Sequence, residues 1–485
     1  MKIKTSAIVY GIRYIRRFGL HTLIIRIIEK KREKDSEYQS FYLETKASLE
    51  QLEKQRMEVS HWNKKEKISI VTPLYHTPAI FLRELIESVL ESSYENWQLC
   101  FADATQDGEE NQIENIVKEY QKMDEKLTGK KSRICYKKLS QNYGIAENTN
   151  QALAMAEGDY IAFLDHDDII TPDALYEMAL AAKCAKKTGK EANMFYSDED
   201  KVNENRTAFF EPHFKPDFNQ DLLNSNNYIT HFLMVSRELL DQVGGINKEY
   251  DGAQDYDFIL RCTELADNVI HIPKVLYHWR VHERSTAAGA GSKDYAIDAG
   301  KCAIESHLQR MGENGKVVVT PYFGFYRIEY GINTENKTED YVLFADQSLK
   351  PLNADWKQIL YADCSRKKIG VVGGKIYDRH HRIYEAAFFE KGDWTGAACG
   401  ENVFSGLREG YGGYMHRANI QMDCDRTIPA PTSPGWAHEK KPPRPKKVEA
   451  AVKRLVGGTV VPRQFFRHFP KTQPGADPRC GRSRR

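Results

Sequence analysis

The sequence has few cysteines, no long apolar run and almost no net charge, and each absence narrows the possible functions. The nine cysteines among 485 residues are scattered and form no Cys-x-x-Cys pair, which argues against a zinc or disulfide framework. No apolar stretch approaches the roughly 18 residues needed to cross a bilayer. The net charge of +2 argues against a nucleic-acid partner. An odd cysteine count without a small-residue cleavage site predicts a cytoplasmic protein.

Positive charge is concentrated at the two ends of the chain. Residues 1–34 contain ten Lys and Arg against two acids, and residues 437–485 contain fourteen against three. The intervening sequence is therefore acidic, which suits a divalent-metal site better than a groove for a polyanion. Residues 1–34 mix apolar and basic side chains, as in a helix lying peripherally on an anionic membrane. A surface helix packed on the rest of the protein would show the same pattern, so both interpretations stay open.

Changes in composition divide the chain into five segments. Ten of the eighteen prolines lie between Pro429 and Pro478, among many Arg and Lys, which predicts a disordered tail. A frameshifted end or an ordinary basic linker would have the same composition. The predicted segments are a basic amphipathic helix with a polar helical linker (1–65), a main domain (66–290), a connecting helix and strand (291–330), a partial second module (331–423) and the Pro/Arg-rich tail (424–485).

Short apolar runs alternate with segments of helical spacing in the first half of the main domain, and the second half is less regular. This alternation is typical of a mostly parallel α/β sheet flanked by helices, in which ligands bind at the carboxyl ends of the strands. Strands are predicted at 68–72, 97–102, 134–139, 160–164, 194–197, 231–235 and 270–279, and helices at 78–90, 111–123, 146–156, 172–184 and from about Asp255.

An acidic cluster, Asp165-His166-Asp167-Asp168, follows the strand predicted at 160–164. In an extended chain alternate residues point to the same side, so Asp165 and Asp167 should face one ligand together. Two carboxylates that share a site repel each other, and a bound Mg²⁺ or Mn²⁺ relieves this repulsion while contacting substrate phosphates. The alternative is a solvated acidic turn in which Asp168 caps the next helix. The position at the end of a buried strand favours the metal site.

Four further residues could take part in the same chemistry. Asp103 ends a predicted strand and could accept a hydrogen bond from a base or ribose, or could be a turn residue. Asp255 lies near a helix N-terminus, whose dipole keeps a carboxylate ionised, and could take a proton from a hydroxyl or simply cap the helix. After the last predicted strand, His282 could complete a metal shell and Arg280 could pair with a diphosphate, or both could belong to a packed strand.

The order of these elements resembles glycosyltransferase family 2 over about residues 66–290. The resemblance implies a GT-A fold, which is a Rossmann-like, nucleotide-diphospho-sugar transferase architecture. It also implies a partial, non-catalytic transferase-like module at 331–423, where Gln347 replaces the expected acid. Four runs further resemble bacterial O-antigen or rhamnan-type polysaccharide glycosyltransferases: Tyr196 to Lys201, Phe214 to Asp217, Gly252 to Asp257 and Leu276 to Arg280.

The resemblance implies roles for individual residues. Asp255 would be the catalytic base, and Asp165, Asp167 and His282 would hold a Mg²⁺ or Mn²⁺ ion. Asp165 would also contact the donor. The other residues implied in binding the nucleotide-sugar are Thr72, Pro73, Tyr75, Asp103, Asn142, Gly144 and Arg280.

The implied reaction is an inverting transfer from a nucleotide-diphospho-sugar, expected to be a UDP- or dTDP-sugar, to a glycan or lipid-linked acceptor of the cell envelope. A sugar nucleotidyltransferase on a related fold should carry a glycine-rich loop after the first strand, and residues 72–78 contain no glycine. A metal-dependent hydrolase would use water as acceptor. An inactive glycan-binding or scaffold protein is the remaining alternative, against which the retained Asp165, Asp167 and Asp255 argue.

Overall fold

The computed structural model describes residues 38–106, 112–187, 192–282, 293–332, 350–352 and 354–366, together with a few isolated positions. Apart from such positions, the predicted N-terminal basic helix, most of the partial second module and the Pro/Arg-rich tail lie outside the described residues. The chain divides into two compact units between Ile328 and Glu329, and the first unit contains the large sheet. None of the described helices is both long enough and apolar enough to cross a membrane.

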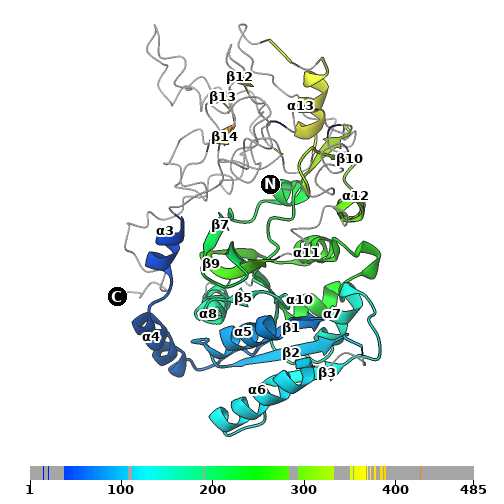
Figure 1. Cartoon of the computed structure of the whole chain (residues 1–485). Coiled ribbons are helices and arrows are strands. Elements are labelled where there is room, and N and C mark those ends of the chain that lie inside the picture. Colours follow the sequence, from blue (N-terminus) through cyan, green and yellow to red (C-terminus); the bar gives the residue numbers. More distant parts are fainter. Residues whose placement is uncertain are drawn as a thin grey trace, which may run out of the picture. The chain divides into compact units, whose positions relative to one another are not determined.

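One mixed sheet organises the first unit, in the order β3-β2-β1-β4-β8-β6-β9-β5, with β7 paired to β6 (Figure 1). Its first half is parallel, because β1 pairs in parallel with β2 and β4, and β2 with β3. The parallel α/β sheet predicted from the sequence is therefore confirmed for this half. The strands are β1 (Ile68–Leu74), β2 (Trp97–Asp103), β3 (Ile134–Lys138) and β4 (Tyr160–Phe163).

The second half of the sheet has mixed strand directions. Strand β8 runs antiparallel to both β4 and β6, whereas β6 and β9 are parallel. Strands β5 and β7 pair antiparallel with β9 and β6. This half contains β5 (Ile169–Ile170), β6 (Met194–Asn203), β7 (Phe209–His213), β8 (Leu233–Ser236) and β9 (Val269–Val281).

Helices pack along this sheet through apolar faces, as in α5, which buries Phe81, Leu82, Leu85, Ile86 and Val89. All helices predicted in the main domain are present, with ends that differ by a few residues. Among the described residues, the helices of the first unit are α3 (Tyr38–Thr45), α4 (Leu49–Ser60), α5 (Ala79–Leu90), α6 (Gln112–Thr128), α7 (Ile145–Leu153), α8 (Ala174–Lys187), α9 (Gln220–Ser225), α10 (Arg237–Val243), α11 (Gln254–Leu265) and α12 (Lys293–Met311), with a 3₁₀ turn η1 (Lys248–Tyr250). Helix α13 (Trp356–Cys364) belongs to the second unit.

Strand β1 continues past Pro73, where the sequence predicted its end. Its pairing with β4 stops at Val71, so the N–H that Pro73 lacks falls beyond that ladder. The pairing with β2 continues to Leu74. A proline can therefore lie inside this central strand without breaking a hydrogen bond to β4.

The segment predicted as a polar helical linker packs against the second half of the sheet through α3. Tyr38 and Tyr42 are buried, and the Tyr38 hydroxyl donates to Asp200 Oδ2 on β6 at 2.7 Å. Tyr42 Oη lies 2.9 Å from Nε2 of His278 on β9. Phe41 and Leu43, which flank Tyr42, are exposed, so apolar periodicity did not reveal the buried face.

Candidate active site

The acidic cluster forms a turn, which corrects the extended geometry predicted for it. Strand β4 ends at Phe163, and the Asp168 N–H donates to the Asp165 carbonyl at 3.2 Å. Strand alternation therefore does not orient Asp165 and Asp167. The Asp165 side chain is 57% exposed, so the turn presents this carboxylate to solvent at the edge of the sheet.

Asp168 is the buried member of the turn and not the helix cap considered from the sequence, because β5 separates it from α8. Its Oδ2 accepts from the Tyr277 hydroxyl at 2.5 Å and its Oδ1 from the Arg280 N–H at 2.7 Å. Burial, and then the charges of Asp167 and Asp165, raise the pKa of the Asp168 carboxyl well above its ordinary value. Three carboxylates crowded in one turn are the setting in which a bound cation is stabilising.

The predicted pair of Asp167 and His282 is brought together, with His282 Nε2 2.9 Å from Asp167 Oδ2. Arg280 is fully buried behind this pair. Its Nε donates to the Asp167 carbonyl at 2.6 Å and its Nη1 pairs with Glu84 Oε2 at 2.6 Å. These contacts favour a role for Arg280 in holding the turn, and direct contact of Arg280 with the donor stays a prediction.

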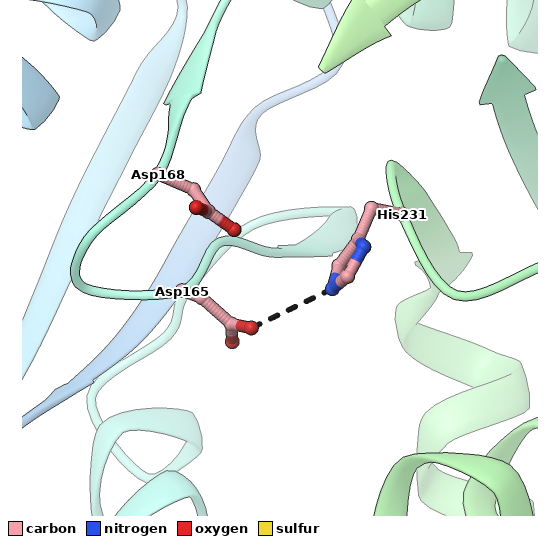
Figure 2. Close-up of side chains that lie close together, drawn as sticks. All are labelled: Asp165, Asp168 and His231. Atoms are coloured by element: carbon pink, nitrogen blue, oxygen red, sulfur yellow. Dashed lines mark ion pairs between the residues drawn. The ribbon is translucent and has the colours of Figure 1, made fainter. Parts of the chain in front are cut away.

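His231, which the sequence analysis did not single out, faces the acidic turn from the loop before β8. Figure 2 shows its ring directed toward Asp165, with Nε2 3.5 Å from Asp165 Oδ2. The ring stacks on Tyr277 with centroids 4.5 Å apart. Burial alone would lower the pKa of His231, but Asp165 and Glu199 outweigh burial and raise it well above its ordinary value. In turn, the His231 charge outweighs the desolvation of Asp165 and lowers the pKa of that carboxyl.

Ligand atoms of Asp165, Asp168 and His231 all lie within 4.8 Å of one another, which makes these three a second candidate set for a cation (Figure 2). Both oxygens of Asp168, however, already accept hydrogen bonds from protein donors. In the set predicted from the sequence, which is Asp165, Asp167 and His282, the carboxylate hydrogen-bonded to His282 is that of Asp167.

A buried ion network lies behind His231. Glu199 Oε2 is 3.0 Å from His231 Nδ1 and 3.4 Å from Lys215 Nζ, and Glu199 Oε1 is 3.1 Å from His213 Nδ1. Burial would raise the pKa of Glu199, but Lys215 and the two histidines hold it well below its ordinary value. Glu199 and Lys215 lie in the runs from Tyr196 to Lys201 and from Phe214 to Asp217, which resemble polysaccharide glycosyltransferases. The sequence alone assigned no role to either residue.

Asp255 lies in the first turn of α11, as predicted, with its side chain exposed. Asn227 Nδ2 donates to Asp255 Oδ2 at 3.0 Å. Desolvation by surrounding atoms raises the pKa of the Asp255 carboxyl, the charge of His231 offsets part of the rise, and the charge of Asp165 adds to it. Asn227, which contacts Asp255, lies four residues before His231, which contacts Asp165.

Asp103 ends β2 and is fully buried. Its Oδ2 accepts from the Tyr136 hydroxyl at 2.7 Å and from Lys138 Nζ at 3.1 Å, and its Oδ1 accepts from the Thr105 N–H at 2.9 Å. Burial opposes ionisation, but these hydrogen bonds outweigh it and lower the pKa of Asp103. Asp103 is therefore a rigidly held anion at the carboxyl end of a strand next to β1.

The remaining predicted donor contacts lie on β1 and on the loop before α7. Thr72 and Pro73 are buried within β1, whereas Tyr75 is 43% exposed. Asn142 Oδ1 accepts from the Gly144 N–H at 3.0 Å. Gly144 has φ of +92°, and a Cβ there would lie 3.0 Å from Asp251 Oδ2, so glycine is needed for this loop. Contact of these residues with a donor stays a prediction.

The topology and the acidic turn define the class of protein. A sheet of this strand order, with carboxylates at the carboxyl ends of β2 and β4, is the architecture of a GT-A glycosyltransferase. Residues 69–244 match the family model described as glycosyl transferase family 2. The chain therefore contains a glycosyl transferase family 2 domain, which confirms the resemblance drawn from its motifs.

Two curated relatives cover slightly more than half of the chain. One is the uncharacterized protein y4gI of Sinorhizobium fredii, 38% identical over 263 residues, which are 54% of this chain and 27% of that protein. The other is the O-antigen biosynthesis protein RfbC of Myxococcus xanthus, 34% identical over 291 residues, which are 60% of this chain and 22% of that protein. The chain thus spans about a quarter of the length of these relatives.

Among solved structures, TarS of S. aureus in complex with UDP aligns with a TM-score of 0.38 and 17% identity, over 50% of this chain and 65% of that one.

Proposed function

We propose that the protein transfers a sugar, with inversion, from a UDP- or dTDP-sugar to a hydroxyl of a growing cell-surface polysaccharide or lipid-linked glycan. The observation that carries the proposal is that one short segment contacts both groups: Asn227 Nδ2 donates to Asp255 Oδ2 at 3.0 Å, and His231 Nε2 lies 3.5 Å from Asp165 Oδ2. A relative of the chain is named for O-antigen biosynthesis, which supports a cell-envelope acceptor.

Asp255 is the base in this proposal. Its carboxylate takes the proton of the acceptor hydroxyl while that oxygen forms a bond to the anomeric carbon of the donor. The bond from the anomeric carbon to the nucleotide diphosphate breaks on the opposite face, which inverts the configuration. A raised pKa makes the Asp255 carboxylate a stronger proton acceptor. General-base help of this kind contributes about 10²- to 10⁴-fold in rate.

Asp165, Asp167 and His282 would hold a divalent cation. Two carboxylates and one imidazole suit Mn²⁺ and tolerate Mg²⁺. Such a cation offsets the charge that develops on the leaving diphosphate. Arg280 then fixes the Asp167 backbone, which keeps the ligand in place.

The test is sugar transfer by the purified full chain, with Mn²⁺ or Mg²⁺, a panel of UDP-, dTDP- and GDP-sugars, and glycan acceptors. Transfer should require the cation and fall at least about 10²-fold in Asp255→Ala, the lower bound for a lost general base. Asp241→Ala, which removes an exposed carboxylate from α10, is the matched control and should keep full activity. Unchanged turnover in both Asp255→Ala and Asp167→Ala would contradict the proposal.

We also propose a cytoplasmic location with peripheral contact of residues 1–34 with the inner membrane face, on the ground of their basic and apolar composition. Sedimentation with anionic vesicles should depend on residues 1–34 and fail with neutral vesicles. Equal sedimentation of a chain lacking those residues would contradict this contact.

A further inference from the structure

One loop reaches both functional elements of the site. It comprises residues 226–232, between α9 and β8, and is called the 226–232 loop below. Near its start, Asn227 Nδ2 donates to Asp255 Oδ2 at 3.0 Å. Near its end, His231 Nε2 lies 3.5 Å from Asp165 Oδ2. The 226–232 loop therefore contains both Asn227, which contacts Asp255, and His231, which contacts the acidic turn.

The loop is held from within the protein. Lys215 Nζ donates to the Ile229 carbonyl at 2.7 Å and also to the His231 carbonyl. The Thr230 hydroxyl donates to the Asn227 carbonyl at 3.1 Å. Asn226 Nδ2 donates to the Gly324 carbonyl at 3.0 Å, away from Asp255. The backbone on both sides of Asn227 is thus fixed by contacts that do not involve the Asn227 side chain.

The Asn227 amide group has only one hydrogen-bond partner among the described residues. Its Oδ1 is buried and accepts no hydrogen bond there, whereas its Nδ2 donates to Asp255. A buried carbonyl oxygen that accepts no hydrogen bond lowers the stability of the folded protein. Asparagine is therefore a poor choice at this position if its role is only to stabilise the fold. The contact with Asp255 is what accounts for an amide at this position.

We propose that Asn227 is a positioning residue for Asp255: its amide N–H engages one carboxylate oxygen and so leaves the other oxygen directed to the acceptor hydroxyl. This inference rests on the proposed function of Asp255 as the base. Fixing the carboxylate rotamer keeps a proton acceptor aligned with the hydroxyl, and small losses of alignment are costly in rate. Among the described residues the Asn227 side chain makes no hydrogen bond to a predicted donor-binding residue, so its effect should fall on the transfer step.

The experiment measures kcat for transfer and KM for the donor in Asn227→Ala, Asn227→Asp and the control Asp241→Ala, which changes an exposed residue of α10. A hydrogen bond to a charged group is worth about 1.5–3 kcal/mol, so kcat should fall about 10- to 100-fold in Asn227→Ala with an unchanged donor KM. Asn227→Asp keeps the shape but removes the N–H donor and adds a like charge, so it should lose at least as much. Asp241→Ala should keep kcat near that of the parent protein.

A double-variant comparison separates positioning from a general loss of structure. Asn227→Ala added to Asp255→Ala should lower transfer no further, because residues that act as a unit are not additive. A full additional loss in the double variant, or parental kcat in Asn227→Ala while Asp255→Ala is inactive, would overturn the role of Asn227 alone. Parental transfer in Asp255→Ala would instead overturn the proposed function and, with it, this inference.

Discussion

The two halves of the sheet place charged residues in different ways. In the parallel half, Asp103 and Asp165 follow the carboxyl ends of β2 and β4, where the strand order brings them to the same edge. In the mixed half, the charges of Glu199 and Lys215 lie inside the protein, with side chains 7% and 0% exposed. Both contact the 226–232 loop.

The difference follows from topology. Parallel strands end at a common edge, so carboxylates placed after them gather at that edge. Strands that run in both directions share no such edge, and the 226–232 loop must be fixed by other means. Buried ions fix it at the cost of desolvation, which several kcal/mol of good contacts must offset. The mixed half should therefore be the part where loss of one charge endangers the fold.

The largest effect that would test this contrast is expected for Lys215→Met. Removing the ammonium leaves Glu199 buried with two histidines as its remaining partners and frees the carbonyls of Ile229 and His231. Breaking a buried pair by removing one partner costs about 3–5 kcal/mol, which the free energy of unfolding in urea should show.

Lys201→Met is the control for Lys215→Met, because it removes the same type of side chain from an exposed ion pair on β6. Lys201 pairs with Glu211, and both side chains are partly exposed, at 29% and 42%. Surface pairs are worth about 0–1 kcal/mol, so this variant should unfold almost like the parent protein. Equal losses in the two variants would erase the distinction between a buried network and an exposed pair in this half.

In the parallel half, Asp103→Asn is expected to weaken donor binding as well as to lower stability, because Asp103 is a fully buried carboxylate paired with Lys138. The amide loses the charge that Lys138 and Tyr136 hold at the end of β2. If Asp103 contacts the nucleotide, the loss of a charged hydrogen bond of about 1.5–3 kcal/mol should raise the donor KM about 10- to 100-fold.

Asp124→Asn separates this effect from the loss of any buried carboxylate in the same half. Asp124 on α6 is fully buried and pairs with Arg133 Nη2 at 2.6 Å, before the start of β3. This variant should lose stability and keep the donor KM. A raised donor KM in both variants would show that Asp103 acts through the fold and not through the nucleotide.

Much of the parallel half could be predicted from the sequence. Its strands and helices alternate at regular spacing, so periodicity located each of them, and family order then gave Asp103, the acidic cluster and Asp255. Two details failed for local reasons. Pro73 was expected to end β1, but pairing with β4 ends first, and the acidic cluster is a turn because Asp168 folds back to Asp165.

The residues of the mixed half could not be assigned in the same way. His231 and Asn227 lie on an irregular loop. Nothing in the sequence around Asn227 indicates that it contacts Asp255, which is 28 residues further along the chain. Glu199 and Lys215 stood in recognisable runs, but their contact arises only when β6 and the segment after β7 meet. Sequence patterns report periodic burial, and these contacts depend on tertiary pairing.

The smallest of these effects is expected for Tyr42→Phe, on the outer side of the mixed half. Tyr42 Oη lies 2.9 Å from His278 Nε2, and His278 Nδ1 lies 2.5 Å from Asp200 Oδ1. Losing one net hydrogen bond costs about 1 kcal/mol, so the unfolding midpoint should fall slightly while kcat stays constant. Leu43→Ala, an exposed change on the same helix, should alter neither. A lowered kcat in Tyr42→Phe would mean that α3 supports the site through β9, and that the buried charges of the mixed half form one functional unit with it.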